Sequence, residues 1–565
     1  MKTAYETSIV IVGAGPVGMS LAIDAALRGI DVIILEQRAP GAPPSTKCNT
    51  VASRTLETFR RFGVADKIRA AGLPDDYPTD FLIATALDGD EIGRIEMPSR
   101  NKRASGGWPD SDWLTPEPVV RASQLYLEPI LYERMLESPN ITVLNSTRAE
   151  RFEQDAEGVT LYAQDTVEDA TVTIRARFLV GCDGGRSTIR KALGIKLVGD
   201  EELGRTRSSL IRSKEVLAKF PGRPAWMTNV VGTRGRGTVI AIDGRELWLV
   251  HRGTQDGDFD SIDLDQSLRD VLGMGPDWKY ELLNHEDWIG RRMVAEQFRV
   301  GNVFIAGDAA HLWVPLAGYG MNAGVADAMN LSFILSSVLK GWADPAILDA
   351  HMAERHPITE QVSRFAAGMG AQNRAAFEFD PDMAAKLDAQ TEEGVSFRAA
   401  FGAAAVVRNR PQFAPKGLNF GYYYDASPLI EYDGEAAPPY SMGEASLSTA
   451  PGCRMPHFWV DEAAGVSVYD LLGPDYTLVQ LAPDADAQPI VKAAATAGVP
   501  LQVATVAPPA GLDVFQHRLL IVRRDVHIVW RGDAAPDDLA GLMQRLRGAR
   551  PLDKPVSPAF ATSTT

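Results

Sequence analysis

The chain has 565 residues, of which 45% are hydrophobic and 23% charged, a composition typical of a folded protein with several domains. Its net charge of −16 argues against nucleic-acid binding, because neutralising phosphates requires clustered Lys and Arg. The first residues lack a basic segment and no apolar run reaches about 18 residues, so neither a signal peptide nor a membrane-spanning helix is expected. The three cysteines are far apart, which excludes a CxxC pair or zinc spacing and favours a cytoplasmic compartment.

Residues 7–36 have the pattern of a β-α-β unit. The β-branched stretch SIVIV predicts a buried strand, and GAGPVG leads into a helix with Pro16 in its first turn and Gly29 at its end. The stretch DVIILE predicts the next strand. Both strands are apolar throughout, as expected for parallel strands that are buried on both faces.

The turn of this unit is a Gly-x-Gly-x-x-Gly motif. Gly13 permits a tight bend, Gly15 lets the backbone approach a pyrophosphate, and Gly18 lets helix and strand pack closely. Free N–H groups at the helix N-terminus favour phosphate, and Glu36, which ends the second strand, can accept hydrogen bonds from a ribose. A glycine turn without a ligand is the alternative. The motif predicts a dinucleotide site but does not distinguish FAD from NAD.

Further along the chain, apolar patterns predict helices at 54–62, 122–136 and 322–370 and a meander of strands at 141–180. The sequence pattern of residues 205–290 predicts an antiparallel sheet. Within it, Asp243-Gly244 lies between two apolar runs, and this dipeptide favours the positive φ angles of a type I′ hairpin turn.

The C-terminal quarter has the pattern of a separate α/β domain. Residues 433–456 have the composition of a linker, and the apolar runs beyond them predict the order β-α-β-β-β-α. This part has no CxxC pair, so thiol–disulfide exchange is not expected there. Packing or oligomerisation is its expected role.

Two further motifs follow predicted strands. In VGCDGGRSTIRKALG, Asp183 precedes a helix with Arg186 and Arg190, although an ordinary strand–turn–helix junction has the same residue types. In VFIAGDAAHLWVPLAGYGMNAG, Asp308 ends a strand, where ligands of open α/β sheets bind, and it can hold a ribose or ribityl hydroxyl. A helix then begins near Asn322, and its N-terminus favours a neighbouring anion.

These three motifs, in this order, resemble those of the class A FAD-dependent aromatic hydroxylases, which are single-component flavoprotein monooxygenases. The stretches KCNTVASRTLETFRRFGVADKIRAAGLPDDYPTD, RASQLYLEPIL and HMAERHPITEQVSRFA are similar to phenol hydroxylases of the 2,4-dichlorophenol 6-monooxygenase type, and the likeness spans residues 5–400. The resemblance implies an α/β (α+β) fold with a Rossmann-like FAD-binding domain, an interleaved antiparallel-sheet substrate domain and a C-terminal thioredoxin-like domain. The expected segments are 1–80, 121–204 and 291–340 for FAD binding, 81–120 and 205–290 for the substrate domain, 341–430 for helices, 431–456 for the linker, 457–555 for the thioredoxin-like domain and 556–565 for a disordered tail.

The resemblance also assigns cofactor contacts. They fall on Gly13, Gly15, Pro16, Gly18, Glu36, Gln37, Arg38, Lys47, Arg121, Gln124, Asp183, Asp308, Pro315, Gly318, Gly320, Met321 and Asn322. Lys47 is expected near the flavin phosphates, and Arg121 and Gln124 beside the flavin. Asp183 is expected to serve both FAD and NAD(P)H, and Asp308 to hold the ribityl–phosphate part.

The reaction implied by the resemblance starts with reduction of FAD by NAD(P)H. Reduced flavin and O₂ then form a C4a-hydroperoxide, which transfers one oxygen atom to a phenolic ring. A base or acceptor near the phenol hydroxyl assists, and the candidates are His251 and Asn49, although asparagine cannot replace the aspartate base of a related branch. Trp313 and Pro315 are expected to line the substrate pocket.

The sequence is also compatible with two other hypotheses for the function. One is a different flavoenzyme on the same scaffold, an oxidase, a reductase or a halogenase, although the GWxWxIP motif of halogenases is absent. The other is a non-catalytic FAD-binding protein. No metal site is expected, and beyond the phenolic substrate the only partner considered is a second copy in a homodimer.

Overall fold

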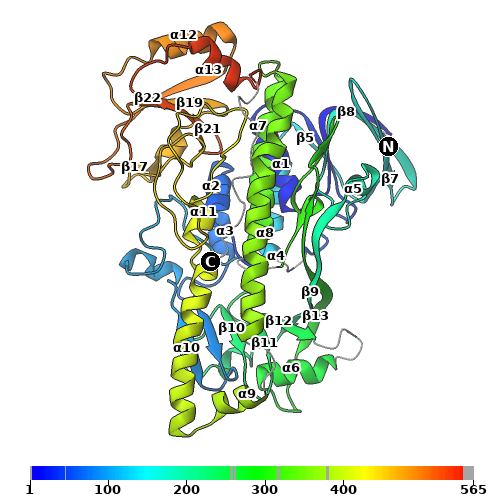
Figure 1. The fold of residues 1–565 in the computed structure, drawn as a ribbon. Coiled ribbons are helices and arrows are strands. Elements are labelled where there is room, and N and C mark those ends of the chain that lie inside the picture. Colours follow the sequence, from blue (N-terminus) through cyan, green and yellow to red (C-terminus); the bar gives the residue numbers. More distant parts are fainter. Residues whose placement is uncertain are drawn as a thin grey trace.

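The computed structural model describes residues 3–550 except 45, 47, 255–258, 260–262, 315–317 and 377–380 (Figure 1). Lys47, Pro315 and the tail 556–565, which the sequence analysis singles out, lie outside the described residues. In the described part of the chain, no helix has both the length and the apolar character needed to cross a membrane.

The first sheet contains the strands that precede all three motifs. Its path is β14-β15-β8-β1-β2-β5, with β6 and β7 added beside β8. The strands are β1 (Ala4–Val12), β2 (Val32–Leu35), β5 (Ile141–Leu144), β6 (Thr147–Asp155), β7 (Gly158–Asp165), β8 (Ala170–Gly181), β14 (Arg299–Val300) and β15 (Val303–Ile305). Both β1 and β15 run parallel to β8, and Val12 and Ile305 are both in register with Gly181. The three motifs therefore leave the sheet at one edge.

Helices pack against this sheet (Figure 1). The helices of this part are α1 (Pro16–Leu27), α2 (Ser53–Arg61), α3 (Ala65–Ala71), α4 (Gln124–Leu136), α5 (Thr188–Ala192), α7 (Tyr319–Leu339) and α8 (Ala350–Ala376). The start of α7 packs against α1, where a Cβ added to Gly324 would lie 2.5 Å from the side chain of Val17. Small residues at this crossing allow the two helix N-termini to lie close together.

A second sheet of eight strands forms the lower body in Figure 1, in the order β16-β13-β9-β12-β11-β10-β3-β4. Its strands are β3 (Phe81–Ala84), β4 (Glu91–Ile95), β9 (Leu197–Arg212), β10 (Met227–Val230), β11 (Gly237–Ala241), β12 (Leu247–Thr254), β13 (Glu281–Ala295) and β16 (His311–Leu312). Helices α6 (Leu264–Leu272), α9 (Pro381–Asp388) and α10 (Glu392–Phe413) accompany it. The two strands β3 and β4 come from far earlier in the chain than their neighbours, so this sheet is assembled from separate segments.

The hairpin β11–β12 is present, but its turn is not type I′. The N–H of Ile242 donates to the carbonyl of Leu247, which leaves residues 243–246 in the loop. Gly244 has a φ of +67°, whereas Asp243 has no positive φ. The Asp243 carboxylate instead accepts hydrogen bonds from the N–H groups of residues 245–247. The predicted turn type is wrong because a side chain satisfies the loop amides.

The C-terminal part has a sheet of four strands in the order β20-β19-β21-β22, with β19 parallel to β20 and antiparallel to β21. Its elements are β19 (Tyr476–Gln480), α12 (Gln488–Ala497), β20 (Leu501–Thr505), β21 (Leu519–Arg523), β22 (Ile528–Gly532) and α13 (Leu539–Leu546), which confirms the predicted order. Before it lie α11 (Lys416–Phe420), β17 (Trp459–Asp461) and β18 (Val466–Ser467). One hydrophobic core continues from α7 into this sheet, and Tyr476 packs edge-on against Phe333.

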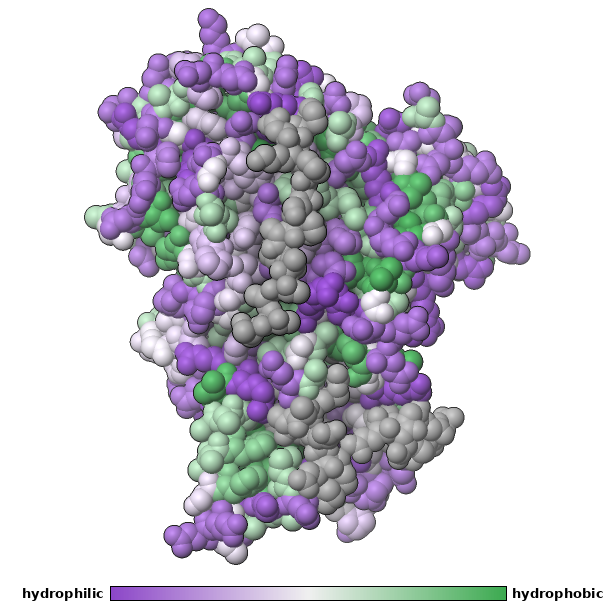
Figure 2. Space-filling model, in the orientation of Figure 1, coloured by the Kyte–Doolittle hydropathy of each residue, from purple (hydrophilic) through white to green (hydrophobic). Residues whose placement is uncertain are grey.

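The surface in Figure 2 is mostly hydrophilic, in line with the net charge of −16. Apolar side chains gather at the lower left of this view, over α10. There Val395 and Val407 are exposed. The outer side of α10 therefore presents an apolar strip to solvent.

Candidate active site

The three motifs meet at the carboxyl ends of β1, β8 and β15. Gly13 has a φ of +105°, and a Cβ at this position would lie 2.4 Å from the carbonyl oxygen of Cys182. Gly307, with a φ of +60°, packs against the side chain of Val17 in the first turn of α1. Glycine suits both the positive φ angles and these close contacts, which explains why both turns contain it.

The N-terminus of α1 faces open space. Gly15 is its N-cap, and no side chain caps the helix. A Cβ added to Gly15 would meet nothing within 4 Å, whereas one added to Gly18 would lie 2.0 Å from the carbonyl oxygen of Gly13. Gly18 therefore serves packing, and Gly15 leaves room beside uncapped N–H groups, which is the environment a pyrophosphate requires.

Glu36 lies at the centre of a polar cluster at the end of β2. Its carboxylate accepts hydrogen bonds from the N–H of Ala14 and from the N–H and Nε of Arg38, all at 3.0 Å. Arg38 also pairs with Glu128 on α4 at 3.2 Å, and the amide of Gln124 donates to the same carboxylate. Burial raises the pKa of Glu128. The structure thus joins Glu36, Arg38 and Gln124 through Glu128, a residue the sequence analysis did not select although it lies one helical turn after Gln124.

The two motif aspartates have different surroundings. Asp183 accepts hydrogen bonds from the hydroxyl of Ser187 and from the N–H and hydroxyl of Thr188, so its carboxylate caps α5. Asp308 is exposed and makes no side-chain hydrogen bond within the described part of the chain. Because Gly307 touches Val17, the carboxylate of Asp308 lies near the start of α1 and is free to bind a hydroxyl group.

The loop before α7 contributes a second uncapped helix N-terminus. Gly318 is the N-cap with a φ of +62° and no side-chain cap. Asn322 fixes this end, because its Oδ1 accepts from the N–H of Ala52 at 2.9 Å while its Nδ2 donates to the carbonyls of Thr50 and Gly318. A Cβ on Gly320 would meet only the indole nitrogen of Trp313, at 3.6 Å. Backbone N–H groups at this end would favour negative charge nearby.

Three further residues that the sequence predicts as cofactor contacts have different surroundings. The guanidinium of Arg121 donates to the Thr50 hydroxyl at 3.0 Å and stacks 4.2 Å from the ring of Trp226, and burial lowers the pKa of Arg121 to about 10. Gln37 is exposed, and Met321 packs against the core.

His251 belongs to the second sheet and forms a polar pair there. Its Nδ1 lies 2.6 Å from the hydroxyl of Ser208, which also accepts a hydrogen bond from the indole N–H of Trp288 at 2.7 Å. Burial lowers the pKa of His251 to about 4, so the ring is neutral at neutral pH. On the same strand as Trp288, Gly290 packs against Val314 of the third motif. The sheet wall therefore meets the loop of the third motif.

Asn49 and Trp313 have no contact with His251 among the described hydrogen bonds and ring contacts. Asn49 donates to the carbonyl of Thr46 at 3.2 Å, while its Oδ1 is buried without a partner among the described residues. Trp313 stacks on His311 with ring centres 4.7 Å apart. The Oδ1 acceptor of Asn49 is thus available to a ligand, while the indole of Trp313 lies beside Gly320 in the first turn of α7.

Comparison with known proteins agrees with this geometry. A family model described as FAD binding domain matches residues 6–366, more than half of the chain, and one described as aromatic-ring hydroxylase, C-terminal, matches residues 448–550. Tetracenomycin B2 monooxygenase-dioxygenase of Streptomyces olivaceus is 28% identical over 96% of this chain and 98% of its own length. For 2,4-dichlorophenol 6-monooxygenase of Cupriavidus pinatubonensis the identity is 27%, covering 97% of each chain.

Among solved structures, the rebeccamycin biosynthetic enzyme RebC with reduced flavin superposes with a TM-score of 0.86 at 32% identity, covering 97% of this chain and 100% of RebC. The open cradle at Gly15, the two uncapped helix N-termini and the carboxylate of Glu36 fit an FAD molecule. The chain therefore belongs to the class A FAD-dependent aromatic hydroxylases, and FAD is its cofactor.

Proposed function

We propose that this chain hydroxylates a phenolic ring, with NAD(P)H as reductant and O₂ as co-substrate. The observation that carries the proposal is the contact between Gly290 of the second sheet and Val314, beside the strand ends that form the FAD cradle. A ring held between this sheet and the flavin would be shielded from water on both sides. The names of the relatives, which specify a dichlorophenol and tetracenomycin B2, support an aromatic substrate.

FAD supplies the oxygen-transferring chemistry when bound, and the protein supplies position and charge. We assign the pyrophosphate to the N-terminus of α1 at Gly15, the adenosine ribose to Glu36 and the ribityl chain to Asp308. The uncapped start of α7 at Gly318 would stabilise negative charge on the reduced ring, because its N–H groups are fixed in advance by Asn322. Arg121 contacts both Thr50, in the loop before α2, and Trp226, beside β10, and would link this loop to the second sheet.

We assign the phenol hydroxyl to His251 and Asn49. The indole of Trp288 can only donate, so Ser208 accepts that bond and can give its own proton to Nδ1 of His251. In this arrangement Nε2 of His251 carries a hydrogen and donates to a phenolate oxygen. The unpartnered Oδ1 of Asn49 would accept from the hydroxyl while the phenol is still protonated.

A panel of phenols tests the proposal, from single-ring phenols to polycyclic ones. We expect the purified protein to carry FAD, to oxidise NAD(P)H faster in the presence of its substrate and to release a product heavier by one oxygen atom. His251→Asn is expected to lower kcat/KM by about 10- to 100-fold without loss of FAD, which is the range for one hydrogen bond to a charged oxygen. Ser208→Ala, which removes the partner of His251, should have a smaller effect of the same sign.

Other products would favour the alternative functions. Hydrogen peroxide without a hydroxylated product would indicate an oxidase, and bound FAD without turnover on any phenol would indicate a non-catalytic protein. The same panel with NADH and NADPH in parallel identifies the reductant.

We also propose that the chain forms a homodimer and is located in the cytoplasm. The exposed Val395 and Val407 on α10 offer an apolar strip to a second copy, and light scattering of the wild-type protein and of Val407→Glu tests this. The cysteines Cys48, Cys182 and Cys453 are all unpaired, which fits a reducing compartment.

A further inference from the structure

A cavity of about 300 Å³ lies where α2, α7 and α8 meet the C-terminal part of the chain. Its walls come from one face each of α2, α7 and α8, from Tyr422 and Tyr424, and from the turn between β21 and β22. None of its lining residues belongs to the second sheet, so it is not the space in which the substrate ring is expected. The cavity shares Asn322 and Trp313 with the start of α7, but the function proposed above places neither FAD nor the phenol in it.

Hydrogen-bond donors without partners surround this cavity. Arg355 is 1% exposed and its Nη1 has no partner among the described residues, nor do Nη1 of Arg54 and Nε of Arg61. The indole nitrogen of Trp313 and the hydroxyl of Thr359 are also buried and unpartnered. The three arginines and Trp313 can only donate, so the missing partner must be an acceptor.

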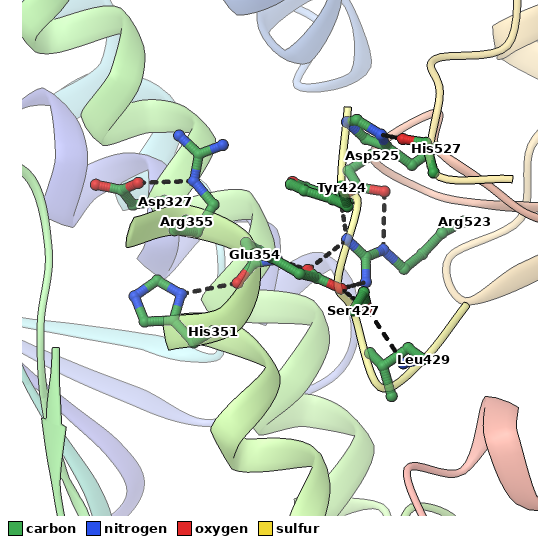
Figure 3. Close-up of polar contacts among 12 residues, drawn as sticks. Asp327, His351, Glu354, Arg355, Tyr424, Ser427, Leu429, Arg523, Asp525 and His527 are labelled. Carbon is green, nitrogen blue, oxygen red and sulfur yellow. Dashed lines mark hydrogen bonds and ion pairs between the residues drawn. The ribbon is translucent and has the colours of Figure 1, made fainter. Parts of the chain in front are cut away.

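Arg355 is held in a fixed orientation toward the cavity. Its Nε donates to Asp327 at 2.8 Å, and the same carboxylate lies 2.7 Å from Nε2 of His311. The terminal nitrogens of Arg355 are directed away from Asp327 (Figure 3). Thr359 lies one helical turn further along α8, so both unpartnered groups are on the same face of this helix.

The charges around the cavity are not balanced. Each of its carboxylates already has an arginine partner: Glu57 pairs with Arg454, Asp470 with Arg60 and Asp525 with Arg523. Two arginines that line the cavity, Arg54 and Arg524, have no carboxylate within ion-pairing distance in the part of the chain that the structure describes. Burial lowers the pKa of Arg524 to about 9, and the neighbouring cation Arg61 adds to this shift.

Four tyrosines form part of the remaining walls, beside aliphatic side chains of α7 and α8. Tyr319, Tyr422, Tyr424 and Tyr469 line the cavity, and the guanidinium of Arg54 lies 4.2 Å from the ring centre of Tyr422. The volume exceeds the need of an inorganic ion and suits a ring with one charged group. Flat apolar groups stack favourably on such rings.

We propose that this cavity binds an aromatic carboxylate, with the carboxylate held by Arg355 and Arg54 and the ring among the tyrosines. The turn between β21 and β22 closes the site, since Nη2 of Arg54 donates to the carbonyl of Asp525 at 3.2 Å. The C-terminal part of the chain thus completes a ligand site next to the helix that begins at the flavin. A bound carboxylate would contact Arg355 directly, and through Asp327 it would be linked to His311 of the third motif.

Benzoate and 4-bromobenzoate are the probes. In crystals of the FAD-loaded protein grown with 4-bromobenzoate, we expect a bromine anomalous peak inside this cavity. In solution, Arg54→Gln should weaken benzoate binding by about tenfold or more, the weight of a hydrogen bond to a charged group. Thr359→Val, which changes only a hydroxyl without a partner, should weaken it by a smaller factor and leave the fold intact.

Arg60→Gln is the matched control, since Arg60 lies on the same helix and at the same cavity but its three nitrogens are already bound by Asp470 and Glu117. It should change benzoate affinity less than about twofold. Inorganic phosphate should bind far more weakly than benzoate, because it has no ring for the tyrosines. A bromine peak only beside the second sheet, equal binding of phosphate, or benzoate affinity unchanged in Arg54→Gln would each overturn the proposal, whatever the outcome of the phenol panel.

Discussion

Two regions along α7 are held together by different interactions: its start, beside the glycine motifs, and its later part, beside α8 and the C-terminal sheet. At its start, α7 meets α1 through Gly324 and Val17, and hydrogen bonds from Asn322 to backbone groups fix the loop. Further along, the side-chain amide of Asn330 donates a hydrogen bond to Glu354 of α8. The Glu354 carboxylate also accepts hydrogen bonds from both terminal nitrogens of Arg523 in the C-terminal sheet, at 2.9 and 2.8 Å (Figure 3). The first region uses glycine and main chain, and the second uses buried charges.

The difference follows from what each region has to do. A cofactor with phosphates needs close approach of the backbone, which only glycine permits at Gly13 and Gly18. The C-terminal part is held by a forked ion pair, which gives it one geometry relative to α8. The following predictions test whether the two regions respond to mutation as differently as they are built.

The largest effect is expected from Glu354→Ala. This change leaves Arg523, which is fully buried, with Asp525 as its only carboxylate partner among the described residues, and it removes the acceptor of Ser427. Loss of one partner of a buried pair costs about 3–5 kcal/mol of unfolding free energy. Urea unfolding followed by circular dichroism measures it.

The control for that experiment is Glu153→Ala, which breaks the exposed pair with Arg151. Exposed pairs contribute little because water screens them. If the two variants lose equal stability, the buried pair does not hold the C-terminal part in place. FAD content should stay close to wild type in both, since neither residue lies near Gly15.

Gly13→Ala is expected to act at the other end. A non-glycine residue at a φ of +105° is strained by about 1–3 kcal/mol, and its Cβ would overlap the Cys182 carbonyl. The turn must shift, and a loss of about 2 kcal/mol of binding free energy corresponds to a fall in FAD affinity of about 30-fold, measured by flavin fluorescence titration. Gly29→Ala is the matched control, because Gly29 also has a positive φ of +78° but open space around its Cβ. It should lose stability while FAD affinity stays unchanged.

The first region could be predicted from the sequence because its signals are local. Gly13 and Gly18 are separated by only a few residues, and the apolar runs before the three motifs predicted strands, which placed each motif at a strand end. The second region could not: Glu354 and Arg523 are 169 residues apart and each lies inside a regular element without a distinctive neighbour. The roles of His251, Asn49 and Trp313 stay predictions, since a lone side chain in a strand or loop carries no spacing to interpret. The type I′ turn failed for a related reason, because the sequence does not show which N–H groups Asp243 accepts from.

Acid should loosen the second region before the first. Burial lowers the pKa of His351 to about 4 and of His527 to about 3, from about 6.5. Between these values the unfolded chain binds more protons than the folded one, so stability is complete above about pH 6.5 and is lost as the pH falls toward 4. Thermal unfolding across this range should show a falling midpoint, and His351→Asn should flatten its slope by up to about one proton. A midpoint that stays constant from pH 7 to about pH 4.5 would contradict the assignment of neutral buried histidines.

The smallest effect on folding is expected from Gly15→Ala, although it should impair cofactor binding. Gly15 has a φ of −76°, which alanine adopts readily, and its added Cβ would meet nothing within 4 Å. The unfolding free energy should therefore change by less than about 0.5 kcal/mol. The methyl group would enter the space assigned to the pyrophosphate, so FAD affinity should fall by about tenfold or more. Gly13→Ala affects folding and binding together, whereas Gly15→Ala separates them. Unchanged FAD affinity in Gly15→Ala would mean that the phosphates approach α1 from another side.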